Sequence, residues 1–180
     1  SVYSNDLGGN TSLENYIGHI EQSENRSIAF PEGSLPIIKT HAYHKGNNKA
    51  IYVIRDGRAA AASLWEFTSP KVPMNNIIEG RHKFGKWCDH IESWNPLSRP
   101  NTLLLKYEDI LNNLDSVLLQ LSIFLERDIT SYQLPSRDKI AGSDGKWVRK
   151  KTDWRNVLSG RDLKRFNEIN QSFLDQFEYL

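Results

Sequence analysis

The sequence predicts an α/β fold, in which a central parallel sheet is flanked by helices. Short apolar runs typical of buried strands alternate along the chain with longer segments whose apolar residues recur at helical spacing. The chain has 180 residues, long enough for one domain with a sizeable core and too short for two ordinary domains. It contains no internal repeat or low-complexity tract. We therefore expect residues 1–180 to form a single domain.

The composition excludes several classes of protein. With 38% hydrophobic and 25% charged residues, the chain is neither disordered nor a collagen-like fibre nor a coiled-coil rod. A formal net charge of +1 creates no overall field that would attract nucleic acid or an acidic membrane. We therefore expect no nucleic-acid partner, and any anion site must be local.

The cysteine content and the apolar patterning bear on the compartment. The single cysteine, Cys88, excludes an intrachain disulfide and any metal site built from several cysteines, and it favours a reducing compartment. No apolar stretch approaches the roughly 20 residues that span a bilayer, and the N-terminus lacks the pattern of a signal peptide. We expect a cytoplasmic protein without a transmembrane segment.

The first elements follow from capping signals and apolar runs. Thr11-Ser12-Leu13-Glu14 resembles a capping box and predicts a short helix through about Ile20. Residues 35–39 form a short, mostly apolar segment that predicts a strand. The five-residue apolar run over 50–54 is typical of a strand buried on both faces of a parallel sheet. The Ala-rich segment 58–67 contains no Gly or Pro and predicts a helix.

The second half of the chain continues the alternation. Residues 75–94 are helical in pattern, with one interruption expected near Gly80 or Gly85. The remaining segments predict a buried strand over 102–105, a core helix over 111–125, a loop over 135–145 and an amphipathic helix over 160–180.

Lys39 and His41 are the first candidate site residues. They stand two residues apart at the end of the strand over 35–39, which places both on one side of the chain. Open α/β sheets bind ligands at the carboxyl ends of their strands. A neutral histidine can take a proton from an acceptor, while a lysine supplies a fixed positive charge. The alternative is a surface lysine beside a histidine that caps the strand.

Arg55 and Ser63 are a second candidate pair. Arg55 ends the strand over 50–54, where a charge requires a partner, and Ser63 lies in the following helix. An arginine and a hydroxyl so placed can converge on one phosphate, with the guanidinium giving two parallel hydrogen bonds. The alternative is that Arg55 pairs with Asp56 and that Ser63 is a small helix-packing residue.

In their order and spacing these segments resemble the sulfotransferase family that uses 3′-phosphoadenosine 5′-phosphosulfate (PAPS). Lys39-Thr40-His41 is similar to the family's Lys-Thr/Ser-His, and Arg55 and Ser63, eight residues apart, to its strand–Arg–helix–Ser signature. Residues 85–94 resemble its Gly-x-Trp-x-x-His-x-x-x-Trp helix, and residues 103–109 its strand ending in Tyr-Glu-Asp. The resemblance covers about residues 35–154.

The resemblance implies a fold, a reaction and a set of roles. The fold would be a three-layer, P-loop NTPase-like α/β fold. PAPS would donate a sulfuryl group to an acceptor hydroxyl or amine, leaving 3′-phosphoadenosine 5′-phosphate (PAP), without a metal. By this resemblance, Arg55 and Ser63 would bind the 3′-phosphate and Tyr107 would contact the adenine side of the cofactor. Lys39 would hold the sulfuryl group, and His41 would be the general base.

A late basic element matches the family less closely. The family's Arg-Lys-Gly followed by Gly-Asp-Trp corresponds here to Arg149-Lys150, then Asp153-Trp154, with a shorter spacing and without the glycine. The resemblance implies that Arg149 and Lys150 bind the 3′-phosphate. The alternative is a solvated basic loop.

The family's opening phosphate loop, roughly Pro-Lys-Ser-Gly-Thr-Thr-Trp, has no counterpart before Leu35. Because the chain also lacks an initiator Met, we expect that loop to lie upstream of Ser1. Two alternatives stay open: a nucleotide-binding or interaction domain without catalysis, and a P-loop kinase, which the Arg55–Ser63 pair and the lack of an acidic strand end disfavour. The acceptor is expected to be a small molecule or a glycan, with a peptide also open, and the oligomeric state is undetermined.

Overall fold

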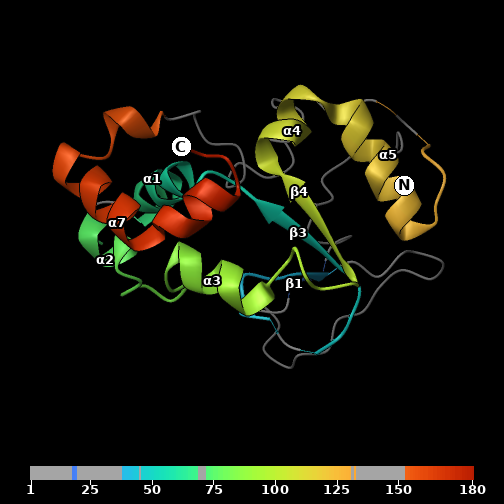
Figure 1. Ribbon diagram of the computed structural model, residues 1–180, viewed down its shortest axis with the longest axis horizontal. Coiled ribbons are helices and arrows are strands. Elements are labelled where there is room, and N and C mark those ends of the chain that lie inside the picture. The colour runs from blue at the N-terminus through green and yellow to red at the C-terminus, as the bar shows by residue number, and fades with distance from the viewer. Residues whose placement is uncertain (1–17, 20–37, 45, 69–71, 131, 133–152) are drawn as a thin grey trace, which may run out of the picture. The chain divides into compact units, whose positions relative to one another are not determined.

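The computed structural model describes residues 18–19, 38–44, 46–68, 72–130, 132 and 153–180 (Figure 1). The chain divides into two compact units. The first unit consists of Ser1–Ala42 and Glu126–Lys150, and the second of Tyr43–Leu125 and Lys151–Leu180.

The first unit contains a short parallel pair of strands. β1 (Gly18–His19) pairs with β2 (Ile38–Lys39) in the register Gly18↔Ile38 and His19↔Lys39. The strand predicted over 35–39 is confirmed at its last two residues. The helix predicted through about Ile20 is wrong at Gly18 and His19, because pairing with β2 gives their backbone an extended partner and glycine has little helix propensity. The other residues of both predictions lie outside the described residues.

The second unit is built on two longer parallel strands, β3 (Ala50–Ile54) and β4 (Thr102–Lys106). They lie side by side, with every residue paired from Ala50↔Thr102 to Ile54↔Lys106 (Figure 1). Both strands and their parallel direction confirm the prediction. Because parallel strands end at the same edge of a sheet, the residues that follow Ile54 and Lys106 are brought together.

The expected burial of β3 on both faces is wrong. Tyr52 and Ile54 are 8% and 2% exposed and pack with Ile91 and Phe177 in one hydrophobic core. The opposite face carries Ile51 and Val53, whose side chains are exposed. An all-apolar run shows that both faces are apolar, but it does not show that both are covered.

The helices that follow β3 agree with the prediction. α1 (Gly57–Thr68) begins one residue earlier and ends one residue later than expected. α2 (Met74–Ile78) and α3 (Trp87–Trp94) are separated by the expected interruption. Both Gly80 and Gly85 stand in that interruption with φ of 71° and 67°, a left-handed conformation that glycine adopts at little cost.

The region after β4 differs from the prediction. α4 (Tyr107–Asn112) and α5 (Leu114–Leu125) replace the single helix expected over 111–125, because Asn113, with φ −143°, interrupts the helical backbone. Val117 is the one residue of α5 that is fully buried, while Leu119 and Ile123 are exposed. The helical spacing of leucines therefore locates α5 correctly but overstates its share of the core.

α7 (Gly160–Gln176) confirms the predicted amphipathic helix, although the helix ends four residues before the chain does. A capping box between Ser159 and Asp162 starts it. It packs against α1, α2 and α3 (Figure 1). Phe166 and Leu174 of this helix are buried. A 3-10 turn, η2 (Trp154–Asn156), precedes it. No helix in the described stretches combines the length and apolarity needed to cross a membrane.

Candidate functional site

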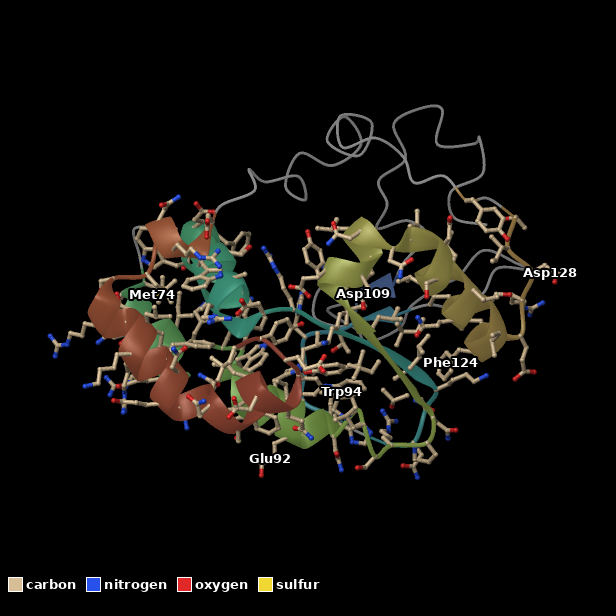
Figure 2. The ribbon with its side chains drawn as sticks, turned by 45° about the horizontal axis from the view of Figure 1, so that its top comes forward. Met74, Glu92, Trp94, Asp109, Phe124 and Asp128 are labelled. Atoms are coloured by element: carbon tan, nitrogen blue, oxygen red, sulfur yellow. The ribbon has the colours of Figure 1, made fainter. Side chains whose placement is uncertain are left out.

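The ends of β3 and β4 bring two predicted site residues into contact. The strands stay in register to Ile54↔Lys106, so Arg55 and Tyr107 come next on neighbouring chains. The Arg55 guanidinium lies over the Tyr107 ring, with Cζ 4.7 Å from the ring centroid. This is a cation–π contact at the edge of the sheet where open α/β folds bind ligands. Asp109, in the first turn of α4, marks this edge in Figure 2.

Arg55 does not pair with Asp56, as the alternative interpretation supposed. The Asp56 carboxylate binds Arg58 instead, with Nη2 2.9 Å from Oδ2 and Nε 3.0 Å from Oδ1. The Arg58 guanidinium also lies 4.6 Å from the Trp154 ring centroid. Because Asp56 is neutralised by Arg58, the charge of Arg55 is held against an aromatic ring.

The Asp56 side chain caps the start of α1. Asp56 stands just before the helix and accepts a hydrogen bond from the Arg58 main-chain N–H at 2.9 Å. Its negative charge thus occupies the positive end of the helix dipole. Arg55 is the basic side chain that directly follows β3 at this edge of the sheet.

Gly57 lets α1 approach the core. A Cβ atom at this position would lie 2.6 Å from Phe166 Cζ and 2.6 Å from Trp87 Cδ2. These contacts are shorter than side chains tolerate, so only glycine permits this packing. α1 thereby leaves β3 at a defined angle and carries Ser63, which is half-buried. In the part of the chain that the structure describes, no hydrogen bond joins the Ser63 hydroxyl to Arg55.

The other predicted site residues lie elsewhere. Lys39 ends β2 in the first unit and is half-buried, and His41 follows it and is exposed. The Thr40 hydroxyl accepts a hydrogen bond from the Ala42 main-chain N–H at 2.9 Å, which turns the chain after the strand. Arg149 and Lys150 lie outside the described residues.

Two residues next to the site were not identified from the sequence. Glu108, directly after Tyr107, accepts hydrogen bonds from the Asp56 main-chain N–H at 3.2 Å and from the Tyr179 hydroxyl at 3.0 Å. Burial and then the negative charge of Glu108 raise the pKa of Tyr179 above its ordinary value. Glu108 could have been identified from the sequence, because it directly follows the predicted site residue Tyr107. Nothing in the local sequence of Tyr179 points to this site.

His90 takes part in an aromatic cluster on α3. Its Nδ1 atom is 2.9 Å from the Tyr52 hydroxyl, and its ring lies 6.3 Å from that of Trp94, labelled in Figure 2. Burial raises the pKa of Tyr52. The His44 ring meets Trp94 edge-on at 5.2 Å, and the His44 main-chain N–H donates to Ser93 Oγ. These are packing contacts between buried or partly buried side chains.

Comparison of the sequence with known proteins gives a family. Residues 10–178 match the profile of the family described as "Sulfotransferase domain". An amine sulfotransferase of Oryctolagus cuniculus is 28% identical over 135 residues, which cover 68% of this chain and 45% of that protein. Sulfotransferase 2B1 of Mus musculus is 30% identical over 171 residues, with 75% and 51% covered. The chain thus spans about half the length of these relatives.

Solved structures show the same fold. Mouse sulfotransferase SULT7A1, solved as a complex with PAP, has a TM-score of 0.59 at 21% identity and covers 69% of this chain and 58% of its own. Retinol dehydratase, solved with androsterone and the inactive cofactor PAP, has a TM-score of 0.57 at 19% identity and covers 69% and 46%. The expected P-loop-like α/β fold, with a parallel sheet and flanking helices, is therefore confirmed.

Proposed function

This chain belongs to the sulfotransferase domain family, and we propose that it acts in the transfer of a sulfuryl group from PAPS to an acceptor hydroxyl or amine. The observation that carries the proposal is the Arg55–Tyr107 stack at the carboxyl ends of β3 and β4. Among the described residues no carboxylate is bound to Arg55, and a guanidinium that lies on an aromatic ring keeps its N–H donors available for a phosphate.

The nucleotide would be bound by side chains from three elements. Arg55 at the end of β3 and Ser63 on α1 bind the 3′-phosphate, and Tyr107 at the start of α4 contacts the adenine side. Arg149 and Lys150 add positive charge to the same phosphate. The Asp56–Arg58 ion pair supports this assignment, because the carboxylate next to Arg55 in the chain is already bound to another guanidinium.

The chemical step would be an in-line displacement at sulfur. When bound, PAPS supplies the activated sulfuryl group. The acceptor oxygen or nitrogen forms the new bond to sulfur as the bond to the 5′-phosphate oxygen breaks, and PAP leaves with that electron pair. His41 takes the proton of the acceptor, and Lys39 stabilises the negative charge on the sulfuryl oxygens. Lys39 and residues that bind phosphate supply the charge that a metal supplies in phosphoryl transfer.

The proposal extends to the class of acceptor and to the cellular compartment. Retinol dehydratase, a structural neighbour, was solved with androsterone, and we propose a small molecule or a glycan as the acceptor here. A single cysteine and a catalytic apparatus that needs no disulfide suit a cytoplasmic protein. Catalysis is favoured over a purely interacting domain because Lys39-Thr40-His41 is present along with the nucleotide motif.

Nucleotide binding tests the proposal directly. Isothermal titration of the chain with PAP and with adenosine 5′-monophosphate compares ligands that differ only in the 3′-phosphate. We expect PAP to bind about ten- to a hundredfold more tightly, the effect of a charge-assisted bidentate contact. Arg55→Ala should abolish this preference, whereas Arg161→Ala, which removes an exposed arginine on α7, should not. Equal affinities for the two nucleotides in the unaltered chain would refute the proposed function.

A further inference from the structure

A closed ring of contacts lies at the ends of β3 and β4. Glu108 accepts hydrogen bonds from the Asp56 main-chain N–H through Oε1 and from the Tyr179 hydroxyl through Oε2. Asp56 binds Arg58 through both carboxylate oxygens, and Arg58 Nη2 donates to the main-chain oxygen of Tyr179. The ring of Glu108, Asp56, Arg58 and Tyr179 joins the β3–α1 junction, the β4–α4 junction and the C-terminal tail, which lie far apart in the sequence.

The ring holds two carboxylates, Asp56 and Glu108, one guanidinium, Arg58, and the neutral phenol of Tyr179. The side chains of Arg58 and Asp56 are 12% and 15% exposed, so their ion pair is largely shielded from water. The Tyr179 hydroxyl donates a hydrogen bond to Glu108, and burial together with that carboxylate raises the pKa of Tyr179 above its ordinary value. A hydroxyl that donates to a carboxylate makes one of the stronger hydrogen bonds in a protein. The ring therefore persists over the neutral pH range.

The ring encloses the point at which the two strands stop pairing. The last ladder partners are Ile54 and Lys106, and beyond them the parallel sheet no longer holds the two chains together. The bond from the Asp56 N–H to Glu108 takes over this task two residues later. Arg55 and Tyr107 lie between the last ladder pair and this bond, so their stacking geometry is set from both sides.

We propose that Glu108 and Tyr179 are positioning residues that hold Arg55 and Tyr107 in place for a nucleotide 3′-phosphate. The proposal rests on the proposed function, because it concerns the nucleotide site named there. Tyr179 acts through Glu108, and Glu108 acts through the main chain of Asp56. The C-terminal tail is thereby part of the support of the site.

The ring and the hydroxyl of Tyr179 make different contacts, so packing and hydrogen bonding can be tested separately. Its ring packs edge-on to Trp87, with centroids 6.3 Å apart, and lies under Lys106 Nζ at 5.6 Å. Only the hydroxyl reaches Glu108. Tyr179→Phe keeps the ring and its apolar neighbours and deletes the hydrogen bond alone.

The experiment compares PAP with adenosine 5′-monophosphate by isothermal titration for the unaltered chain and for Tyr179→Phe. We expect the ratio of the two affinities to fall about tenfold in the variant, the fold-change that corresponds to one hydrogen bond to a charged group. Tyr132→Phe is the matched control, since Tyr132 is 59% exposed, and it should leave the ratio unchanged. A lower melting temperature with an unchanged ratio would overturn the proposal, because a purely structural hydrogen bond does not discriminate between the two nucleotides.

Glu108→Gln provides a second, independent variant. The amide keeps an oxygen for the Asp56 N–H but removes the charge that Tyr179 binds, so we expect the same loss of the ratio. If Tyr179→Phe does not fold, this variant decides the question. A preference for PAP in the unaltered chain that survives both changes overturns the positioning role. Absence of that preference in the unaltered chain refutes the proposed function instead.

Discussion

At the end of β3, two arginines three residues apart have different partners. Arg58 takes the nearby carboxylate of Asp56 and lies on Trp154, while Arg55 lies on Tyr107. A cation over an aromatic ring retains in-plane N–H donors, and the contact contributes about 0.5–2 kcal/mol. An ion pair with Asp56 would have used those donors. This division of partners supports the proposal that Arg55 binds an external phosphate.

His41 and Lys39 are predicted to have separable effects. In an assay with PAPS and an acceptor that the protein turns over, His41→Ala should lower kcat by about 10²–10⁴-fold, the usual contribution of a positioned general base. The affinity for PAP should stay within about twofold, because a base contacts the acceptor rather than the nucleotide. Lys39→Ala should lower both kcat and PAPS affinity, since it would contact the transferred group.

His44 is the control for this prediction. It lies three residues after His41, and its ring packs against Trp94. His44→Ala should lower stability with little change in kcat. Near-normal kcat in His41→Ala together with a large loss in His44→Ala would show that the base is His44.

At the scale of elements, the position of α1 depends on a close approach at its first residue. Gly57→Ala should destabilise the chain by about 1–3 kcal/mol, because the added methyl group would lie within contact distance of Trp87 and Phe166 and force them apart. The gain in helix propensity, about 1 kcal/mol, offsets only part of this cost. Urea denaturation followed by tryptophan fluorescence measures the change.

Gly160 offers a matched glycine at the start of α7. A Cβ atom there meets no other atom within 4 Å, so Gly160→Ala should leave stability unchanged or raise it by up to about 1 kcal/mol. Equal losses in the two variants would show that the contact at Gly57 is not what limits the packing of α1.

At the scale of the whole molecule, two buried tyrosines predict how the stability of the fold depends on pH. Burial raises the pKa of Tyr52 and of Tyr179 above the ordinary value of 10.0. A phenol with a raised folded-state pKa binds its proton more tightly in the folded than in the unfolded chain. Its contribution is therefore complete below pH 10 and is lost as the pH rises from there toward the folded-state pKa.

Urea denaturation between pH 8 and 11.5 measures this loss. Above pH 10, the free energy of unfolding of the unaltered chain should fall by up to about 1.4 kcal/mol per pH unit more than that of Tyr179→Phe. The variant lacks the Tyr179 phenol and keeps only that of Tyr52. Tyr132→Phe should follow the unaltered chain, since the Tyr132 side chain is 59% exposed. Parallel curves for Tyr179→Phe and the unaltered chain would contradict the assignment.

Local patterns were enough for most of the elements. Three elements could be predicted from residues that are neighbours in the sequence, and the structure confirms all three. They are the strand over 50–54, the Ala-rich helix that follows it and the amphipathic helix that begins at Gly160. Two of the failures depend on residues distant in sequence. Gly18 and His19 are extended because β2 pairs with them, and the outer face of β3, with Ile51 and Val53, is exposed although it is apolar. Partners distant in sequence decided both.

The sequence by itself determined the family motifs and the order of the elements, because a strand, a helix and a spacing of eight between Arg55 and Ser63 are properties of neighbouring residues. Only the tertiary structure decided which partner each charge takes. Arg55 meets Tyr107 because two strands separated by about fifty residues run parallel in one register, and Glu108 meets Tyr179 because α7 returns the C-terminus to the ends of those strands. The energy of such contacts depends on the distance between the two groups in space, and that distance is known only once the chain is folded.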